Sequence, residues 1–465
     1  MKQTFLSRFT FGNLKPAQQI VISFIGVIFT GGFLLSLPIS NNPNVPAAPF
    51  LDHLFTATSA VCVTGLAVIF PGVQYTWVGQ LIMIVLMQIG GLGLMTMIAA
   101  FVIYLGSRMT LSDRLSILEA INRSGLKDFR RFVLNIIKYT FVFESIGFLI
   151  LCTQFVPEFG WAKGSYTALF TAVSAFCNAG FDNIGTISLI DYVHNPLVNL
   201  TVAALIVMGG LGFGVWFDLS RASKSVLKRN QTLRRIAHHL MTHTKLAIFM
   251  TVSLILSGMV LIFFIEYTNP NSLGPLDFGT QLMASFFQSV TLRTAGFSTL
   301  NIAVLRPATQ LLMMIYMFIG GSPGGTAGGI KTTTLAILVL MIWAEINNQK
   351  DIRVFGHTIA REQFRKAFVV FFALLVTLLT GIVLLTLIEP FDFLSIAFEA
   401  TSAIGTVGLS MGITTALSDW GKIIIMMLMY LGRIGPLTLV LSIGDHTKHL
   451  KSNDLTYPSA NILIG

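Results

Sequence analysis

The chain has 465 residues, of which 54% are hydrophobic and only 11% are charged, and its formal net charge is +10. Soluble globular proteins devote about a quarter of their residues to charged side chains, so this composition excludes an ordinary soluble domain and predicts one polytopic membrane domain. The positive charge alone does not indicate nucleic acid. No nucleic-acid-binding motif accompanies it, and we expect no nucleic-acid partner.

Eight apolar segments are long enough to cross a hydrocarbon core of ~30 Å. Most Lys and Arg residues lie at the chain ends and in every second connection between these segments. Short basic loops stay in the cytoplasm, which places both termini and three connections there and makes membrane lipid an expected partner. The predicted segments lie near residues 17–37, 77–105, 132–155, 192–217, 245–265, 309–344, 364–388 and 420–443.

A shorter, semi-apolar segment lies between spans one and two, three and four, five and six, and seven and eight. Each of these segments is too short to cross the bilayer, as expected of a re-entrant helix. The four short segments read ATSAVCVTGL, AVSAFCNAGF, QSVTLRTAGF and ATSAIGTVGL. Aligned on Gly65, Gly180, Gly296 and Gly408, they are separated by 115, 116 and 112 residues. We therefore predict an all-α integral membrane fold of four pseudo-fourfold repeats, each made of helix, re-entrant pore helix, filter loop and helix.

The predicted organisation begins with a cytoplasmic N-terminus at residues 1–16 and ends with a cytoplasmic C-terminus at residues 444–465. Three cytoplasmic loops join the repeats. The repeats span residues 17–105, 132–217, 245–344 and 364–443, and the loops span residues 106–131, 218–244 and 345–363.

The four loops suit the chemistry of a dehydrated monovalent cation. Backbone carbonyls aimed at a common axis can replace the water that such an ion must lose, and each loop needs a glycine to take a backbone conformation closed to most residues. The pore helices also direct their negative carbonyl ends at the loops. The predicted filter residues are Val63, Thr64, Gly65, Asn178, Ala179, Gly180, Thr294, Ala295, Gly296, Thr406, Val407 and Gly408.

The sixth segment is interrupted by GGSPGGTAGGIK, which contains no bulky residue apart from its final Ile and Lys. One interpretation is a kinked helix that packs closely through small residues. The other is a broken helix that forms a gate below the filter, and we favour it. The predicted gate residues are Gly320, Gly321, Ser322, Pro323, Gly324, Gly325, Thr326, Ala327, Gly328, Gly329, Lys331 and Arg433.

Arg433 is the only basic residue inside the eighth segment, and it follows Gly408 by 25 residues, as Gly321 follows Gly296. A charge at membrane depth is costly and usually functional. We expect Arg433 to face the pore below the filter; the alternative is a side chain near a helix end that reaches water. Arg293, three residues before Gly296, is expected to brace its loop from behind.

The four loops resemble the filter loops of the Trk/Ktr/HKT superfamily of potassium transporters, and the resemblance runs over the whole chain. Within this superfamily, the chain is most similar to the Ktr-type pore subunit of bacteria. The resemblance implies potassium uptake across the plasma membrane, a homodimer, and a cytosolic nucleotide-binding ring as regulatory partner. It also implies no cofactor, with K⁺ as the transported ion and Na⁺ as a candidate activator. The second glycine of the TVGYG filter is missing, which implies a shorter filter.

Three alternatives remain open. The pathway could be less selective and carry sodium or ammonium, or the chain could be a structural subunit without a flux of its own. An intramembrane enzyme would need paired acids or a Ser/His pair at membrane depth, and we expect no enzyme. Asp218 and Glu345 lie at predicted helix ends and are expected to be ordinary solvated charges.

Overall fold

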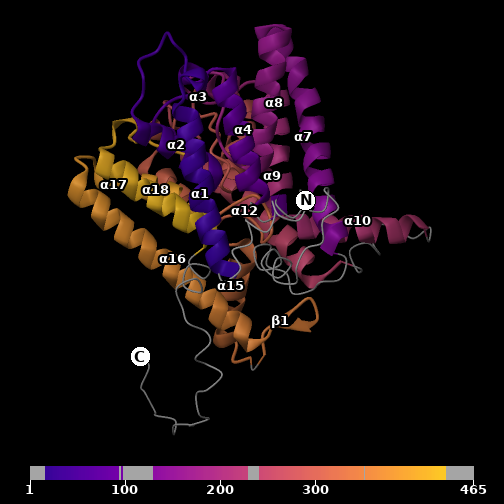
Figure 1. Cartoon of the computed structure of the whole chain (residues 1–465). Helices are drawn as coiled ribbons and strands as arrows, with labels where there is room; N and C mark the ends of the chain where they lie inside the picture. Colours follow the sequence, from indigo (N-terminus) through magenta and orange to yellow (C-terminus); the bar gives the residue numbers. More distant parts are fainter. Residues whose placement is uncertain (1–15, 94–95, 98–128, 229–239, 350, 436–465) are drawn as a thin grey trace, which may run out of the picture.

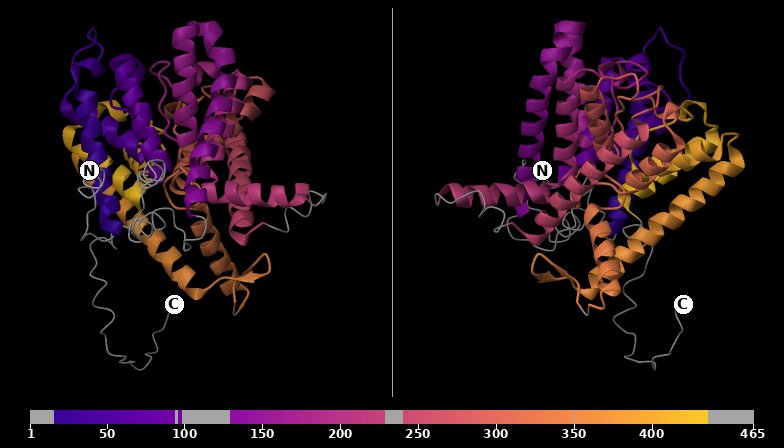
Figure 2. Two further views of the ribbon diagram at one scale, coloured as in Figure 1. Left: turned by 45° about the vertical axis from the view of Figure 1, so that its right-hand side comes forward. Right: turned by 180° about the vertical axis from the view of Figure 1, so that it is seen from behind.

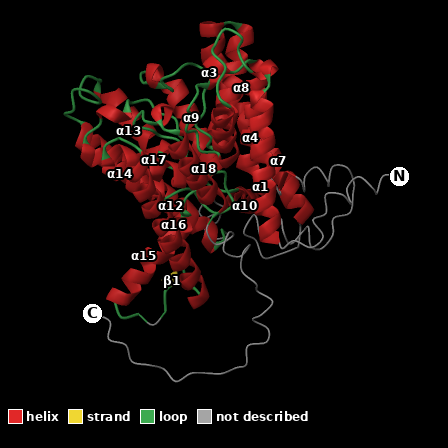
Figure 3. Ribbon diagram, turned by 60° about the vertical axis from the view of Figure 1, so that its left-hand side comes forward, coloured by secondary structure: helices red, strands yellow, loops and turns green. Residues whose placement is uncertain are grey.

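The structure is a computed structural model, and it describes residues 16–93, 96–97, 129–228, 240–349 and 351–435. The predicted helical architecture is confirmed (Figures 1 and 3). Within the described residues, four helices are each long and apolar enough to cross a membrane, and one bent pair is a fifth candidate. The predicted termini and much of the loop at 106–131 lie outside the described residues.

The helices fall into four groups of the same order: a long, largely exposed helix, a short, largely buried helix and a third helix. The first group is α1 (Pro16–Ser36), α2 (Phe50–Cys62) and α4 (Trp77–Leu92). The second is α7 (Phe129–Phe159), α8 (Trp161–Cys177) and α9 (Pro196–Gly210). The third is α12 (Thr242–Glu266), α13 (Phe278–Thr291) and α14 (Pro307–Phe318), and the fourth is α16 (Arg361–Ile388), α17 (Phe393–Gly405) and α18 (Asp419–Ile434).

The remaining elements are short or lie between the groups. They are α3 (Pro71–Gln74), α10 (Phe213–Lys228), α15 (Thr332–Ile346), the 3₁₀ turns η1 (Pro38–Ser40), η2 (Ile190–Tyr192), η3 (Ile302–Val304) and η4 (Thr414–Ala416), and the antiparallel strands β1 (Arg353–Val354) and β2 (His357–Thr358). The hairpin β1–β2 is an exception to the predicted all-α fold, and it lies inside the predicted loop at 345–363.

Capping side chains fix where several of these helices begin. Thr76 and Ser418 accept hydrogen bonds from backbone N–H groups in the first turns of α4 and α18, and Asn195 does so for α9. Asp277 and Asp392 play the same part for the buried helices α13 and α17. These side chains satisfy N–H groups that have no partner within the helix, so the local sequence sets the start of each element.

The packing between groups closes into a ring. The third helix of each group packs against the short buried helix of the next, as α4 does with α8, α9 with α13, and α14 with α17. The ring closes where α18 packs against α2. There the ammonium of Lys422 lies 2.6 Å from the carboxylate of Asp52, and both side chains are about nine-tenths buried. Residues 370 positions apart thus join the last group to the first.

The interruption predicted within the span at 309–344 is present, since α14 and α15 are separated by residues 319–331. Two other predicted features differ from the structure. The predicted span at 192–217 ends at Gly210, and the chain then turns by 93° into α10, whose residues 218–228 lie in the loop predicted at 218–244. Asp218 is buried rather than solvated, because its carboxylate accepts a hydrogen bond from the backbone N–H of Met241 at 2.9 Å.

Candidate functional site

Each of the four buried helices leads into a turn with the same unusual backbone. The residue two positions before the aligned glycine has a positive φ in every loop, with values of 57° for Val63, 59° for Asn178, 65° for Thr294 and 50° for Thr406. Left-handed backbone costs a residue with a side chain about 1–2 kcal/mol, and more for β-branched residues. Such strain persists only where surrounding structure imposes it, and it gathers at functional sites.

Hydrogen bonds with the preceding helix hold these turns. In the first loop, Thr64 N donates to Ser59 O at 2.8 Å, and Gly65 N donates to the Ser59 hydroxyl at 3.0 Å. The fourth loop repeats both bonds, from Val407 N to Ser402 O at 2.8 Å and from Gly408 N to the Ser402 hydroxyl at 3.0 Å. These two turns therefore close as helix-terminating motifs, and Ser59 and Ser402 orient the glycines that follow them.

The four aligned glycines lie in a closed ring. Their φ angles are 92°, 73°, 83° and 93° in chain order. A Cβ on Gly65 would lie 2.5 Å from Ala179 O, one on Gly180 would lie 2.7 Å from Ala295 O, and one on Gly296 would lie 2.7 Å from Val407 O. A Cβ on Gly408 would overlap Thr64 O. Each glycine therefore lies against the carbonyl that precedes the glycine of the next loop, and the fourth loop returns to the first.

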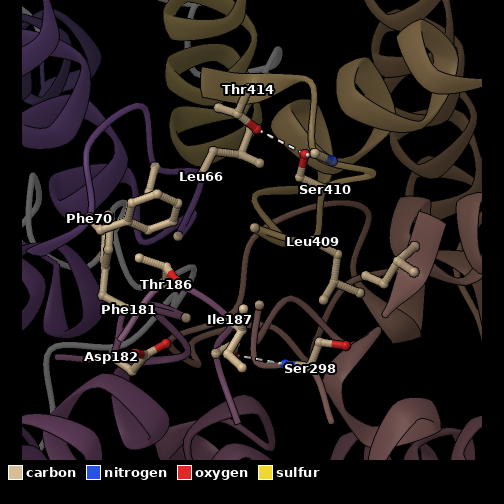
Figure 4. Close-up of a pocket in the computed structure, with 18 of the residues that line it drawn as sticks. Leu66, Phe70, Phe181, Asp182, Thr186, Ile187, Ser298, Leu409, Ser410 and Thr414 are labelled. Atoms are coloured by element: carbon tan, nitrogen blue, oxygen red, sulfur yellow. Dashed lines mark hydrogen bonds between the residues drawn. The ribbon is translucent and has the colours of Figure 1, made fainter. Parts of the chain in front are cut away.

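A cavity of about 330 Å³ opens on one side of this ring (Figure 4). All four glycines are among its lining residues. Most of its wall comes from the segments that follow the glycines. Ser410 is held there by Glu399, whose carboxylate accepts its hydroxyl at 2.8 Å and also the hydroxyl of Thr414. The cavity, which we call the mouth, therefore adjoins all four loops.

Asp182 is the acidic residue among the cavity-lining residues (Figure 4). Its carboxylate accepts the backbone N–H of Ile184 at 3.2 Å. Withdrawal from water raises the pKa of Asp182 to about 6, although hydrogen bonds from Ile184, Gly185 and Ser188 act in the opposite direction. The side chain can thus offer a negative charge to a cation in the cavity near neutral pH.

The segment 319–331 lies on the other side of the ring. A Cβ on Gly328 would overlap the hydroxyl of Thr406, so the segment passes next to the fourth loop. It is pinned at its ends by Gly320 N to Ile330 O at 2.8 Å and Thr332 N to Gly321 O at 3.0 Å. These bonds bring the end of α14 and the start of α15 together across an irregular loop. Membrane proteins tolerate such a loop where it is buried in protein or lines a cavity.

The segment 319–331 also binds the second group and its own lysine. Thr326 Oγ1 donates to Phe176 O at 3.1 Å, at the end of the second buried helix. The ammonium of Lys331 donates to Ala327 O at 2.7 Å. Polar contacts therefore hold the segment in a defined position beneath the loops. The predicted gate residues between Gly320 and Lys331 all lie in this one segment.

Arg433 joins the segment 319–331 to α4. One guanidinium nitrogen donates to Thr326 O, and the other donates to Gly90 O and, at 3.4 Å, to Gly91 O. The planar fork of arginine suits such a bridge between two sets of carbonyls. The side chain lies against the segment predicted as a gate, rather than at the water-exposed end that was the alternative.

Arg293 is only 4% exposed, and its Nε and Nη2 atoms have no hydrogen-bond partner among the described residues. Its backbone carbonyl accepts the side-chain N–H of Asn178 at 3.3 Å, which ties the second loop to the third. The burial of Arg293 is compatible with the bracing role expected from the sequence, whereas the link to Asn178 could not be read from the sequence.

Glu144, on α7, is a buried acid that the sequence analysis did not single out. Its carboxylate accepts the side-chain N–H of Gln88 at 2.5 Å, and the thiol of Cys177 lies 4.0 Å away. Gly91 packs against the same cysteine, since a Cβ there would lie 2.8 Å from the sulfur. The one available signal was an isolated Glu inside an apolar segment, which marks membrane-embedded function or structure.

Comparison with known proteins gives consistent relatives. Residues 9–450 match the family model TrkH, described as "Cation transport protein". The chain is 38% identical to the Ktr system potassium uptake protein B of Bacillus subtilis, over 97% of both chains. It is also 38% identical to the potassium/sodium uptake protein NtpJ of Enterococcus hirae, over 97% of this chain and 98% of that one.

Among solved structures, the chain is similar to the potassium transporter TrkH from Vibrio parahaemolyticus, with a TM-score of 0.72 and 18% sequence identity. The match covers 94% of this chain and 86% of that one. At this identity the likeness concerns the fold, which the two chains share over almost their whole length.

Proposed function

The chain belongs to the TrkH family of cation transport proteins, and from this premise we propose that it takes up potassium through a pore formed by the four loops. It is a multi-pass membrane transporter and not an enzyme. Relatives named for potassium uptake at 38% identity over nearly the full length support potassium as its ion.

The observation that carries the proposed pore is the closed ring of glycines. Four carbonyls, those of Thr64, Ala179, Ala295 and Val407, each lie beside the glycine of a neighbouring loop. A ring of backbone oxygens can replace the hydration shell of a potassium ion. The C-terminal ends of four helices meet at this ring and add partial negative charge. We propose that these loops are the selectivity filter and that the chain has pseudo-fourfold symmetry with eight spans.

The segment 319–331, next to the filter, is proposed to be the gate. Its contact with Thr406 and the hydrogen bond that Thr326 O accepts from Arg433 support a position across the ion path. We propose that the loop moves aside during transport and that the mouth lined by Asp182 faces outside. The basic connections then face the cytoplasm of a bacterial cell. A homodimer and a cytosolic nucleotide-binding ring are the proposed partners, and Na⁺ is a proposed activator.

The alternative is a less selective monovalent cation pathway. One relative is named for uptake of both potassium and sodium, so ion preference is the property that a first experiment should measure. The purified chain in potassium-loaded vesicles should take up rubidium, and external potassium should compete at least about tenfold more effectively than sodium or ammonium. Equal competition by the three ions would support the less selective pathway. Rubidium uptake no greater than in empty vesicles would contradict transport by this chain alone.

Outside pH should modulate the flux through Asp182. Because its pKa is raised to about 6, the carboxylate becomes neutral as outside pH falls from about 7 to about 5, whereas an ordinary Asp stays charged over that range. Loss of one charge at the mouth should lower rubidium uptake at limiting rubidium about threefold. Asp182→Asn keeps an oxygen for the Ile184 N–H and should show the lower uptake at both pH values. The same pH dependence in the variant would contradict this role.

A further inference from the structure

The bend between α9 and α10 is hydrogen-bonded to the segment 319–331. Three backbone hydrogen bonds join them: Ser322 N to Gly210 O at 2.9 Å, Thr326 N to Gly209 O at 3.2 Å, and Phe213 N to Gly324 O at 3.0 Å. Because Phe213 is the first residue of α10, the helix and the segment share a hydrogen bond directly.

The backbone of the bend lies in close contact with the segment 319–331. Gly212 has a φ of 91°, and a Cβ there would lie 2.6 Å from Pro323 O. Only glycine suits both the backbone angle and the close approach. A displacement of α10 at this point therefore has to displace the segment as well.

Two hydrogen bonds connect the first half of α10 to neighbouring elements. Tyr139 on α7 donates its hydroxyl to Ser220 at 2.8 Å. Asp218 accepts the N–H of Met241, just before α12. The helix leaves α9 at 93° and runs sideways from the foot of the bundle (Figures 1 and 2). If α9 runs along the membrane normal, α10 lies parallel to the membrane plane.

The exposed face of α10 is basic. Among the side chains of α10 that the structure describes, residues 213–224, the exposed ones are Arg221 and Lys224. The sequence continues with Lys228, Arg229, Arg234 and Arg235. The one acid of α10 is Asp218, which is buried and engaged with α12. A helix that lies in the membrane plane with a basic face fits one occupant best, namely anionic phospholipid headgroups.

We propose that α10 binds the inner leaflet of the membrane, with Arg221 and Lys224 contacting anionic headgroups. This contact holds the segment 319–331 under the filter. The lipid fixes α10 in the membrane plane, α10 fixes the bend at Gly209–Phe213, and the bend fixes the segment through its three hydrogen bonds. Anionic lipid therefore lowers the flux. The inference rests on the proposed gate and on the proposed orientation.

The first test measures rubidium uptake in vesicles of phosphatidylcholine alone and of phosphatidylcholine mixed equally with phosphatidylglycerol. The anionic mixture should reduce uptake by the wild-type chain about fivefold. This is the factor expected if the attraction of one basic side chain to an anionic surface stabilises the closed position of the segment. Arg221→Gln with Lys224→Gln should show high uptake in both vesicles. The control is Arg361→Gln with Arg365→Gln, which removes the same charge from exposed positions on α16. It should respond to lipid as the wild type does.

The second test needs no ion flux. A fluorophore attached through Ser223→Cys on α10 reports contact between α10 and lipid. The Cys152→Ala background confines labelling to this position, because Cys62 and Cys177 are buried. Brominated phosphatidylglycerol should quench it more strongly than brominated phosphatidylcholine, and the preference should vanish with Arg221→Gln and Lys224→Gln. Equal quenching by both lipids would overturn the headgroup site and leave this face for a protein partner.

The two tests separate the claims. Selective quenching together with uptake that ignores lipid composition would overturn the coupling between α10 and the segment. Selective quenching without rubidium uptake in any variant would contradict transport by the chain alone. The proposed headgroup site on α10 would stand in that case. A rise in wild-type uptake with phosphatidylglycerol would overturn the proposed direction of control.

Discussion

Gly408→Ala is expected to reduce rubidium uptake at least about tenfold and to weaken the preference for potassium over sodium. The new Cβ would overlap the carbonyl oxygen of Thr64, at a backbone angle of φ 93°. Because that oxygen belongs to the neighbouring loop, the methyl group must push one carbonyl out of the ring. Uptake and its competition by sodium, normalised to inserted protein, measure the effect.

Gly412→Ala is the matched control, because it lies in the same loop with a φ of 98° and nothing within 4 Å of its Cβ position. Both substitutions force alanine into left-handed backbone, at a cost of about 1 kcal/mol or more, but only one reaches the ring. Gly412→Ala should therefore keep its ion preference while losing some thermal stability. If both variants lose selectivity equally, backbone strain rather than the ring explains the result.

Gly65→Ser extends the test to the next contact in the ring, which joins the first loop to the second. Its Cβ would lie 2.5 Å from Ala179 O, so it should also raise competition by sodium while the chain remains inserted. Unchanged competition in Gly65→Ser would mean that the first loop does not contribute to selection, and the four-loop filter would then be wrong.

Arg433→Ala is expected to increase maximal rubidium uptake about tenfold. Its guanidinium joins Thr326 O to Gly90 O, and hydrogen bonds from a charged group contribute about 1.5–3 kcal/mol each. Loss of even one such bond frees the segment 319–331 by about a factor of ten. Removal of the positive charge near the ion path acts in the same direction. Uptake is measured at saturating rubidium, per amount of inserted protein.

Arg433→Lys separates the two contributions. Lysine keeps the charge but has no planar fork with which to bridge two carbonyls, so its uptake should lie between those of the wild type and Arg433→Ala. Uptake in Arg433→Lys equal to that of Arg433→Ala would assign the whole effect to the bridge. If neither variant differs from the wild type, Arg433 does not hold the gate.

Much of the candidate site follows from local sequence. The aligned glycines appear as repeated loop motifs, and all four have positive φ. The glycine-rich interruption of the sixth segment is a break between α14 and α15. The offset of Arg433 from Gly408 placed it beside that segment. In each case the signal was a residue type with a strong backbone or solvation preference, which acts wherever the chain places it.

The bend after Gly210 could not be read from the sequence in the same way. Residues 192–217 form one apolar run, and hydropathy alone does not distinguish a straight helix from one that turns by 93°. The buried positions of Asp218 and Glu144 were missed for a related reason. A lone carboxylate gains its partner, Met241 or Gln88, only when distant helices meet.

By itself, the sequence determined the membrane environment, the four loop motifs and the residues able to adopt left-handed backbone, because composition and backbone preference are local properties. The tertiary structure alone decided which loop touches which and where the charged side chains end. The carbonyl of Thr64 meets Gly408, and Arg433 reaches Gly90 across 343 positions of chain. Such contacts depend on how the helix groups pack in a ring, and close packing of surfaces far apart in the chain leaves no local pattern in the sequence.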